Sequence, residues 1–168
     1  MTVHTTFDSP LGELLLIGDE RPDGTLALAS LSVPGQKGGA AVPADSRPDP
    51  AVFAEAVRQL TAYFAGELHD FDLPTAPRGS AFQERVWAAI DVIPYGTTTT
   101  YGAIAERVGT SRAGVRAVGT AIGANPLLLV RPCHRVIGAD GALRGYAGGL
   151  DRKEYLLVHE GALAARVR

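Results

Sequence analysis

Three short stretches near the start of the chain are predicted to be β-strands, and the last of them alternates apolar and polar residues, which is the pattern of a half-buried strand. These stretches lie at 3–7, 14–17 and 26–33. The sequences SPLG and RPDG separate them, and their proline, glycine and aspartate favour tight turns. We therefore expect a small antiparallel sheet.

A polar segment rich in proline, glycine and alanine follows at 34–50, and this composition predicts a flexible loop. Apolar residues then recur at helical spacing from Val52 to Phe64, and Gly66 ends the run. The sequence HDFDLP, at 69–74, suggests one more short strand. Together these segments predict an N-terminal α/β domain over residues 1–78.

From Ser80 onward the apolar spacing becomes helical. Ser80 and Gln83 form a capping-box sequence, and Pro94 stops the helix that follows. Two shorter helices are predicted at 101–108 and 114–122, with a glycine-containing turn between them. Such a pair is a helix-turn-helix candidate. It is also common as ordinary helix packing, so the pattern by itself leaves both interpretations open.

The end of the chain predicts three further features. LLLV at 127–130 is typical of a buried strand, and GADG predicts the turn of a hairpin. Asp151 is placed to cap a last helix, with Leu150 packing on Tyr155 as a hydrophobic staple. We expect residues 79–168 to form a mostly helical second domain, which makes the chain an α+β protein.

Composition and charge narrow the class of protein. The net charge is −2, yet residues 1–80 carry 5 basic and 11 acidic residues (−6) and residues 81–168 carry 11 and 7 (+4). A basic half is typical of a nucleic-acid face, although two ordinary surfaces give the same split. No signal segment or apolar run of about 20 residues is present. We expect a cytoplasmic protein without membrane contact.

Cys133 is the only cysteine of the chain and lies in the sequence PCHR. One thiol excludes an internal disulfide, and the four histidines are too scattered for a metal site, so no metal is expected. A lone cysteine is often an inert core residue. Here Pro132 fixes the backbone before it, and positive charge on His134 and Arg135 would favour the reactive thiolate. We therefore favour a nucleophilic thiol.

The ordered motifs FQERVW, YGTTTTYGAIAERVG, RAVGTAIGANP, PCHRVI and GYAGGLDRKEYLLVHEG resemble those of the O6-alkylguanine-DNA alkyltransferases, also called methylated-DNA–protein-cysteine methyltransferases. The resemblance covers residues 80–162. TVHTTFDSPLGELLL and AYFAGEL are similar to the bacterial constitutive members. This resemblance implies a ribonuclease-H-like N-terminal domain and a winged-helix-like C-terminal domain with a helix-turn-helix.

The resemblance also implies the role of each residue at the reaction centre. Cys133 corresponds to the alkyl acceptor, and His134 to a histidine that contacts a water beside the sulfur. Glu160 corresponds to the acid that completes this relay. Asn125 matches the asparagine that ties the helix-turn-helix to the active-site loop. Tyr101 matches a tyrosine that donates to the guanine ring and crowds the backbone phosphate.

Further residues correspond to family positions that contact DNA or line the substrate pocket. Arg116 matches the arginine that enters the duplex where the damaged base leaves. The other predicted DNA contacts are Ala117, Gly119, Ile122 and Arg135. The predicted pocket residues are Tyr146 on the wall, Ala147 with its N–H toward O6, Gly148, and Val136, whose carbonyl with that of Cys133 accepts from the guanine amino group.

The reaction implied by the resemblance is direct reversal of DNA damage. An O6-alkylguanine is flipped out of duplex DNA and its alkyl group moves to Cys133, once per molecule and without a cofactor. We expect a monomer in solution and leave cooperative assembly on DNA open. Two alternatives remain, which are a DNA-binding module that senses lesions without repairing them and a Cys-His hydrolase.

Three departures from the family pattern are visible. The turn at 109–116 is one residue longer than usual and lacks the common proline. Arg131 replaces an apolar residue before PCHR, so its charge must reach solvent, DNA or an acid. Ala147 lacks the hydroxyl that some members carry at this position.

Overall fold

The computed structural model describes residues 1–76 and 78–164. Its internal contacts divide the chain into two compact units. The first contains Met1–Pro77 and Pro126–Val130, and the second contains Arg78–Asn125 and Arg131–Arg168. The short segment 126–130 thus belongs to the first unit. A single boundary at 78/79, as expected from the sequence, does not describe this arrangement.

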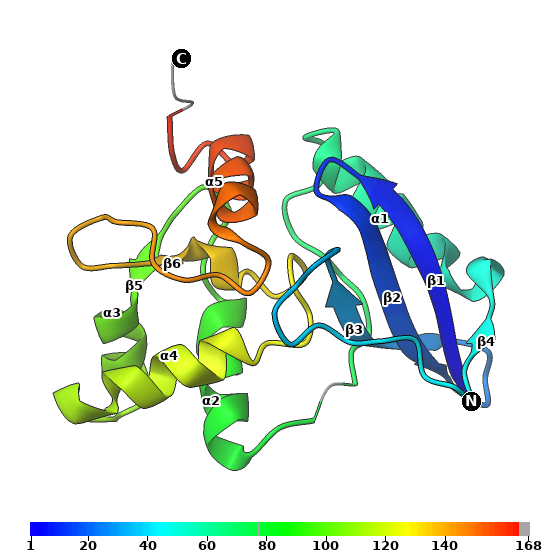
Figure 1. Cartoon of the computed structure of the whole chain (residues 1–168), viewed down its shortest axis with the longest axis horizontal. Helices are drawn as coiled ribbons and strands as arrows, with labels where there is room; N and C mark the ends of the chain where they lie inside the picture. The colour runs from blue at the N-terminus through cyan, green and yellow to red at the C-terminus, as the bar shows by residue number, and fades with distance from the viewer. Residues whose placement is uncertain (77, 165–168) are drawn as a thin grey trace. The chain divides into compact units, whose positions relative to one another are not determined.

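The first unit is built on a four-stranded sheet of order β3-β2-β1-β4 (Figure 1). β1 (Thr2–Ser9), β2 (Gly12–Glu20) and β3 (Leu26–Ser32) are antiparallel, as the sequence predicted. β4 (Arg47–Pro48) pairs in parallel with β1 at the edge. The sequence analysis missed β4, because a two-residue strand inside a polar segment carries no alternation.

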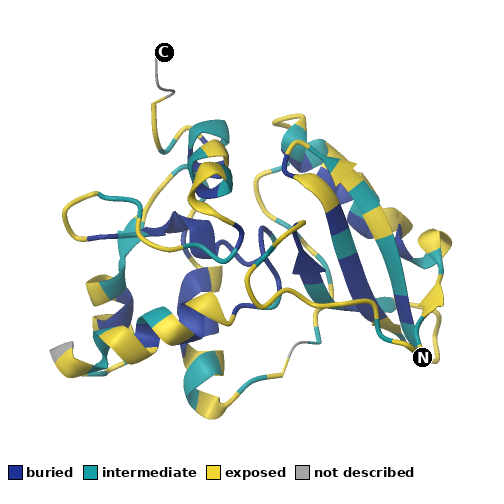
Figure 2. Ribbon diagram, viewed as in Figure 1, coloured by how far each residue is buried: buried dark blue, intermediate teal, exposed yellow. Residues whose placement is uncertain are grey.

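One helix accompanies this sheet. A 3₁₀ turn, η1 (Pro50–Phe53), leads into α1 (Ala54–Phe64), and Gly66 takes a positive φ of 79° just beyond it. The core of the unit is formed by fully buried side chains from the strands and from α1, including Leu14, Leu16, Leu28, Leu60 and Tyr63. Figure 2 shows the buried stripes of these elements.

Two segments expected to be strands are not regular strands. In 69–74 the buried Gln59 amide binds the backbone N–H and C=O of Asp72, both at 2.9 Å, and only Thr75 bridges Leu28. In 127–130 only Leu127 bridges β3, at Leu31, before the chain turns. Tertiary hydrogen bonds thus override the local apolar pattern.

Three helices of the second unit pack against one another, namely α2 (Ala81–Asp91), α3 (Tyr101–Arg107) and α4 (Val115–Gly123). The capping box of α2 is present, with Ser80 Oγ accepting from Gln83 N at 3.1 Å. The turn between α3 and α4 contains a 3₁₀ segment, η2 (Arg112–Gly114). Both predicted helices of the helix-turn-helix therefore form within a residue of their expected ends.

The remainder of the second unit corrects the predicted hairpin. β5 (Thr99–Thr100) pairs in parallel with β6 (Val136–Ile137), and the GADG turn leads into residues 142–147 without a strand. The last helix, α5 (Leu150–His159), is preceded by Gly149 at φ 93°, so Gly149 takes the cap position expected for Asp151. Leu150 and Tyr155 are both exposed, so the predicted staple is absent.

Candidate functional site

Cys133 opens a short 3₁₀ turn, η3 (Cys133–Arg135), which follows Pro132 and leads directly into β6. The thiol is buried, with 4% of the residue exposed. The backbone N–H of Cys133 donates to the carbonyl of Arg131 at 2.8 Å. The acceptor turn, as we call residues 131–135, is thus held closed by a main-chain hydrogen bond beside the sulfur.

The electrostatics of the thiol differ from the sequence-based expectation. Burial raises the pKa of Cys133 to about 11, because the thiolate loses its hydration. A hydrogen bond from the Asn125 side chain and the charges of Lys153 and Arg131 partly oppose this rise. The expectation that His134 and Arg135 supply this charge was wrong, since both are engaged by Glu160. The resting thiol is therefore protonated at neutral pH.

Glu160 ends α5 and binds both residues that follow the cysteine. Its Oε2 lies 2.8 Å from His134 Nε2, and Arg135 donates to it through Nε at 2.7 Å and Nη2 at 3.0 Å. Arg135 Nη1 also donates to the carbonyl of Ile93 at 2.7 Å. The three charged side chains are at most 6% exposed. Arg135 is therefore committed to Glu160, and the structure speaks against its predicted contact with DNA.

His134 is set up to accept a proton. Burial lowers the pKa of its imidazole, although Glu160 opposes that shift. The hydrogen bond between Nε2 and the carboxylate places the ring proton on Nε2, which leaves Nδ1 as an acceptor. Nδ1 is buried and has no hydrogen-bond partner among the residues that the structure describes. A buried acceptor without a partner is a site for an ordered water or for a transferred proton.

Asn125 connects the end of α4 to the acceptor turn. It is 2% exposed, and its Nδ2 donates to the carbonyl of Arg131 at 3.1 Å. Its side chain also contacts the thiol. The structure thus brings Asn125, Cys133, His134 and Glu160 together.

Lys153 of α5 is a site residue that the sequence analysis missed. It is completely buried, and its Nζ donates to three carbonyls, those of Val136 at 2.6 Å, Arg144 at 3.2 Å and Gly145 at 3.4 Å. Burial lowers the pKa of this amine to about 8. One signal was available, because positive charge in the first turn of a helix is opposed by the helix dipole. A lysine at this position therefore indicates that contacts with other parts of the fold stabilise its charge.

The segment 144–148, which we call the pocket loop, carries three of the predicted substrate-pocket residues, Tyr146, Ala147 and Gly148, whereas Val136 lies in β6. Lys153 holds its first half, and Arg152 Nη1 donates to the carbonyl of Gly148 at 3.0 Å. Ala147 is half-buried and Gly148 is buried. The hydroxyl of Tyr146 is buried without a hydrogen-bond partner among the described residues, and burial raises its pKa.

Tyr101 begins α3 beside the pocket loop. Its hydroxyl donates to the carbonyl of Gly145 at 3.4 Å, and the Lys153 ammonium lies 5.9 Å from its ring centroid. Burial raises the pKa of Tyr101, and the charge of Cys133 adds to that rise. Tyr146 also interacts electrostatically with Cys133. Both predicted tyrosines therefore belong to the surroundings of the sulfur.

The predicted DNA contacts on α4 fall on two faces of the helix. Arg116 and Ala117 are exposed, and Gly119 is half-buried beside the Tyr101 ring. Ile122 is only 6% exposed and lies on the apolar face with Val118. Its side chain is therefore part of the core of the second unit, and the structure speaks against its predicted contact with DNA.

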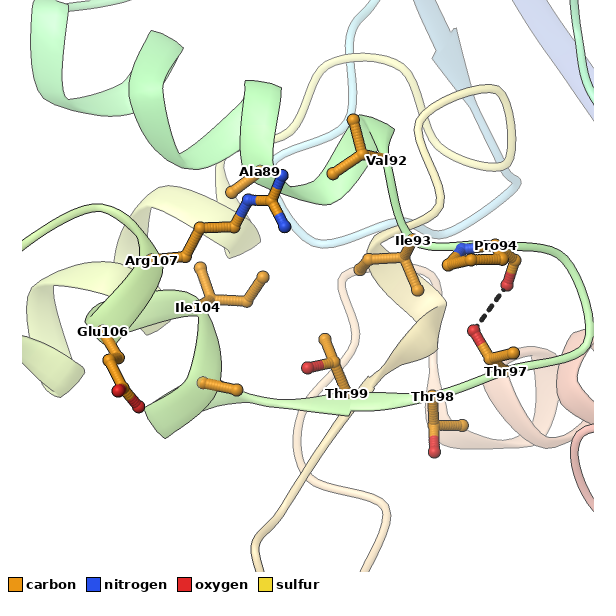
Figure 3. A pocket seen from close by; sticks show the side chains of 11 residues that line it. Ala89, Val92, Ile93, Pro94, Thr97, Thr98, Thr99, Ile104, Glu106 and Arg107 are labelled. Atoms are coloured by element: carbon orange, nitrogen blue, oxygen red, sulfur yellow. Dashed lines mark hydrogen bonds between the residues drawn. The ribbon is translucent and has the colours of Figure 1, made fainter.

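A separate open cavity of about 490 Å³ lies in the second unit (Figure 3). It is lined by the end of α2, the segment 92–99 and α3, including Glu106 and Arg107. None of the predicted site residues lines it. Among the described residues no group of three histidine, cysteine or acidic side chains is placed to hold a metal ion. No described helix is long and apolar enough to span a membrane.

Comparison with known proteins places this geometry in a family. Residues 2–77 match the ribonuclease-like domain of 6-O-methylguanine DNA methyltransferase, and residues 81–162 match its DNA-binding domain. A methylated-DNA–protein-cysteine methyltransferase of Methanosarcina acetivorans is 48% identical over 95% of this chain and 98% of its own length. One of Mycolicibacterium paratuberculosis is 49% identical over 95% and 93%.

A solved structure of a relative has a similar fold. The crystal structure of Mycobacterium tuberculosis OGT in complex with DNA is similar at a TM-score of 0.85 and 46% identity, covering 95% of this chain and 92% of that one. Two domain matches that together span most of the chain, and relatives of nearly equal length, agree with the arrangement around Cys133. The chain belongs to the 6-O-methylguanine DNA methyltransferase family.

Proposed function

We propose that this protein repairs O6-alkylguanine in double-stranded DNA by transferring the alkyl group to Cys133, once per molecule. The observation that carries the proposal is a single buried thiol in the same 3₁₀ turn as His134, whose Nε2 lies 2.8 Å from Glu160 Oε2 in a buried pair. The family membership and the DNA complex of the Mycobacterium tuberculosis relative support it.

The first step is ionisation of the thiol. With a pKa of about 11, Cys133 needs a base at neutral pH. His134 Nδ1 accepts the thiol proton, directly or through one water, and Glu160 stabilises the imidazolium that forms. Arg135 keeps the Glu160 carboxylate ionised by holding both of its oxygens. The thiolate gains further support from the Asn125 amide.

The second step is an in-line displacement. The sulfur attacks the alkyl carbon, an S–C bond forms, and the bond from that carbon to guanine O6 breaks with its electron pair staying on the base. Tyr101 is placed to donate a proton to the leaving ring, and it faces the pocket loop that carries Tyr146 and Ala147. The product is a thioether with no second nucleophile to open it, so the protein acts stoichiometrically and needs no cofactor.

The base must leave the duplex to reach the buried sulfur, which costs a few kcal/mol. The exposed part of α4, with Arg116 and Ala117, is the surface that we assign to DNA, with Arg116 filling the space of the flipped base. Contacts in the minor groove would read sequence poorly, which suits a protein that repairs guanine in any context.

The decisive experiment follows a labelled methyl group. Duplex DNA containing O6-[methyl-¹⁴C]methylguanine is incubated with the wild type and with Cys133→Ala, and peptide mapping locates the label. We expect one methyl per protein, on Cys133, and none in the variant. Release of labelled methanol with repeated turnover would indicate a Cys-His hydrolase. DNA binding without transfer would indicate a lesion sensor.

A second experiment tests the role of Arg116. Arg116→Ala should slow repair of duplex DNA much more than reaction with free O6-benzylguanine, because only the duplex requires base flipping. Arg58→Ala, which removes an exposed arginine of α1, is the matched control and should react like the wild type in both assays. Equal slowing of both reactions by Arg116→Ala would contradict the assigned role.

A further inference from the structure

Arg131, two residues before the acceptor cysteine, is buried and contacts two side chains of α2. It is 8% exposed, and its guanidinium carbon lies 5.0 Å from the ring centroid of Trp87. Its Nε donates to Asp91 Oδ1 at 3.1 Å. Trp87 and Asp91 are four residues apart on α2, so they lie on one face of the helix. The charge therefore reaches an acid, one of the three outcomes expected from the sequence.

This contact lies at the carboxyl-terminal end of α2, which ends at Asp91. A cation at the end of a helix is favoured by the helix dipole, and a guanidinium over an indole adds a cation–π contact. Trp87 is itself fixed, because its Nε1 donates to the carbonyl of Ala121 in α4 at 2.9 Å. The side chain of Arg131 is thus anchored to α2, which Trp87 in turn joins to α4.

The main chain of Arg131 carries the other half of the connection. Its carbonyl accepts from Asn125 Nδ2 at 3.1 Å and from the backbone N–H of Cys133 at 2.8 Å. A single residue therefore joins the end of α2, the Asn125 amide and the acceptor turn. Any shift of Arg131 moves the carbonyl that positions both groups next to the sulfur.

We propose that Arg131 is a positioning residue for alkyl transfer, which fixes the acceptor turn to the end of α2 through Asp91 and Trp87 and adds positive charge beside the thiol. This inference rests on the proposed function. The charged and titratable groups that act on Cys133 are Lys153, Arg131, Tyr101 and Tyr146, together with the Asn125 amide.

The test compares two variants of Arg131 with a matched control. Arg131→Met keeps the hydrocarbon over Trp87 but removes the charge and the bond to Asp91, whereas Arg131→Lys keeps the charge. Arg85→Met is the control, because Arg85 also lies over a ring of α2, that of Phe82 at 5.6 Å. The rate of transfer from O6-benzylguanine is measured for each, with folding verified by circular dichroism.

We expect Arg131→Met to react about 10-fold to 100-fold more slowly, Arg131→Lys to recover part of the loss, and Arg85→Met to match the wild type. A second readout is direct. Because Cys133 is the only cysteine, one ¹³Cβ NMR signal reports its ionisation. The midpoint of this ionisation should rise in Arg131→Met, because a positive charge that lowers the pKa of the thiol is lost, and it should stay near the wild-type value in Arg131→Lys.

A wild-type rate together with a wild-type ionisation midpoint in Arg131→Met would overturn the proposal. If that variant does not fold, Asp91→Asn serves instead, since Asp91 is half exposed, and an unchanged transfer rate in it would also overturn the proposal. The NMR titration needs no alkyl transfer. Failure of the wild type to accept a methyl group would therefore reject the proposed function while the charge effect of Arg131 stays measurable.

Discussion

Lys153→Met replaces the buried ammonium that joins α5 to β6 and to the pocket loop. Lys153 is one of two lysines in the chain, which has 16 basic residues in total, and methionine keeps much of its length. The substitution leaves the carbonyls of Val136, Arg144 and Gly145 without their common donor, although Gly145 retains the Tyr101 hydroxyl.

The expected change in the free energy of unfolding follows from the pKa of Lys153, which burial lowers from 10.5 to about 8. At about 1.36 kcal/mol per unit, charging the buried amine costs about 3 kcal/mol relative to the unfolded chain. Hydrogen bonds to a charged group contribute about 1.5–3 kcal/mol each, so the two short bonds offset that cost. At pH 7 the variant should therefore lose only about 0–3 kcal/mol of unfolding free energy.

The contribution of Lys153 to the free energy of unfolding depends on pH. Between pH 8 and 10.5 the unfolded chain binds more protons at this lysine than the folded chain does, so its contribution to stability rises with pH. That contribution is complete above pH 10.5 and is lost as the pH falls through about 8. The unfolding free energy of the wild type minus that of Lys153→Met should thus increase by about 3 kcal/mol across this window.

Urea unfolding of both proteins at pH 7.5, 9 and 10.5 measures the difference. The Cys133 thiol, with a pKa of about 11, stays largely protonated in the folded state over this range, so its coupling to Lys153 contributes little to the difference. Lys37→Met removes the other lysine, which is exposed, and its curve should run parallel to that of the wild type. A constant difference between the wild type and Lys153→Met over the whole range would refute the burial of an ammonium at this site. The same variant should transfer alkyl groups more slowly, because the pocket loop loses its support.

Three further predictions concern stability and are all measured by urea unfolding at pH 7. Glu160→Gln should cost about 3–5 kcal/mol, because it leaves the Arg135 charge buried without its partner; a loss below about 1 kcal/mol would contradict the buried ion pair. Gly149→Ala should cost about 1–3 kcal/mol at its φ of 93°, whereas Gly123→Ala, in α4 with open space around it, should be neutral or stabilising. Trp87→Phe should cost about 1–2 kcal/mol through the lost indole hydrogen bond, and no change would show that this bond contributes nothing.

Local features of the fold were predictable because their causes are local. The strands β1 to β3 follow from short apolar runs bounded by turn residues, with alternation clearest in β3, and α2 begins where Ser80 and Gln83 cap it. The ordered motifs around PCHR also indicated the residues that the structure gathers near the sulfur. Cys133, His134, Asn125 and Glu160 could all be named before any coordinates.

Features that depend on distant contacts were not predictable in this way. The parallel pairing of β5 with β6 joins Thr99 to Val136, and no local pattern reports such a pair. The predicted DNA residues Arg135 and Ile122 are buried, one in an ion pair and one in the core. The sequence shows which side chains are apolar or charged and which of them share a helix face. It does not show which other element packs over that face.

The amino-acid sequence by itself determined the strands β1 to β3, the helices α1 to α5, the single nucleophile and the family to which the motifs point. Only the tertiary structure decided the chemistry of that nucleophile. Burial raises the pKa of Cys133, and the charges of Lys153 and Arg131, which the sequence did not connect with the thiol, oppose that rise. The physical reason is that capping and periodicity act over a few neighbouring residues. The cost of a charge, in contrast, depends on every group that replaces water around it.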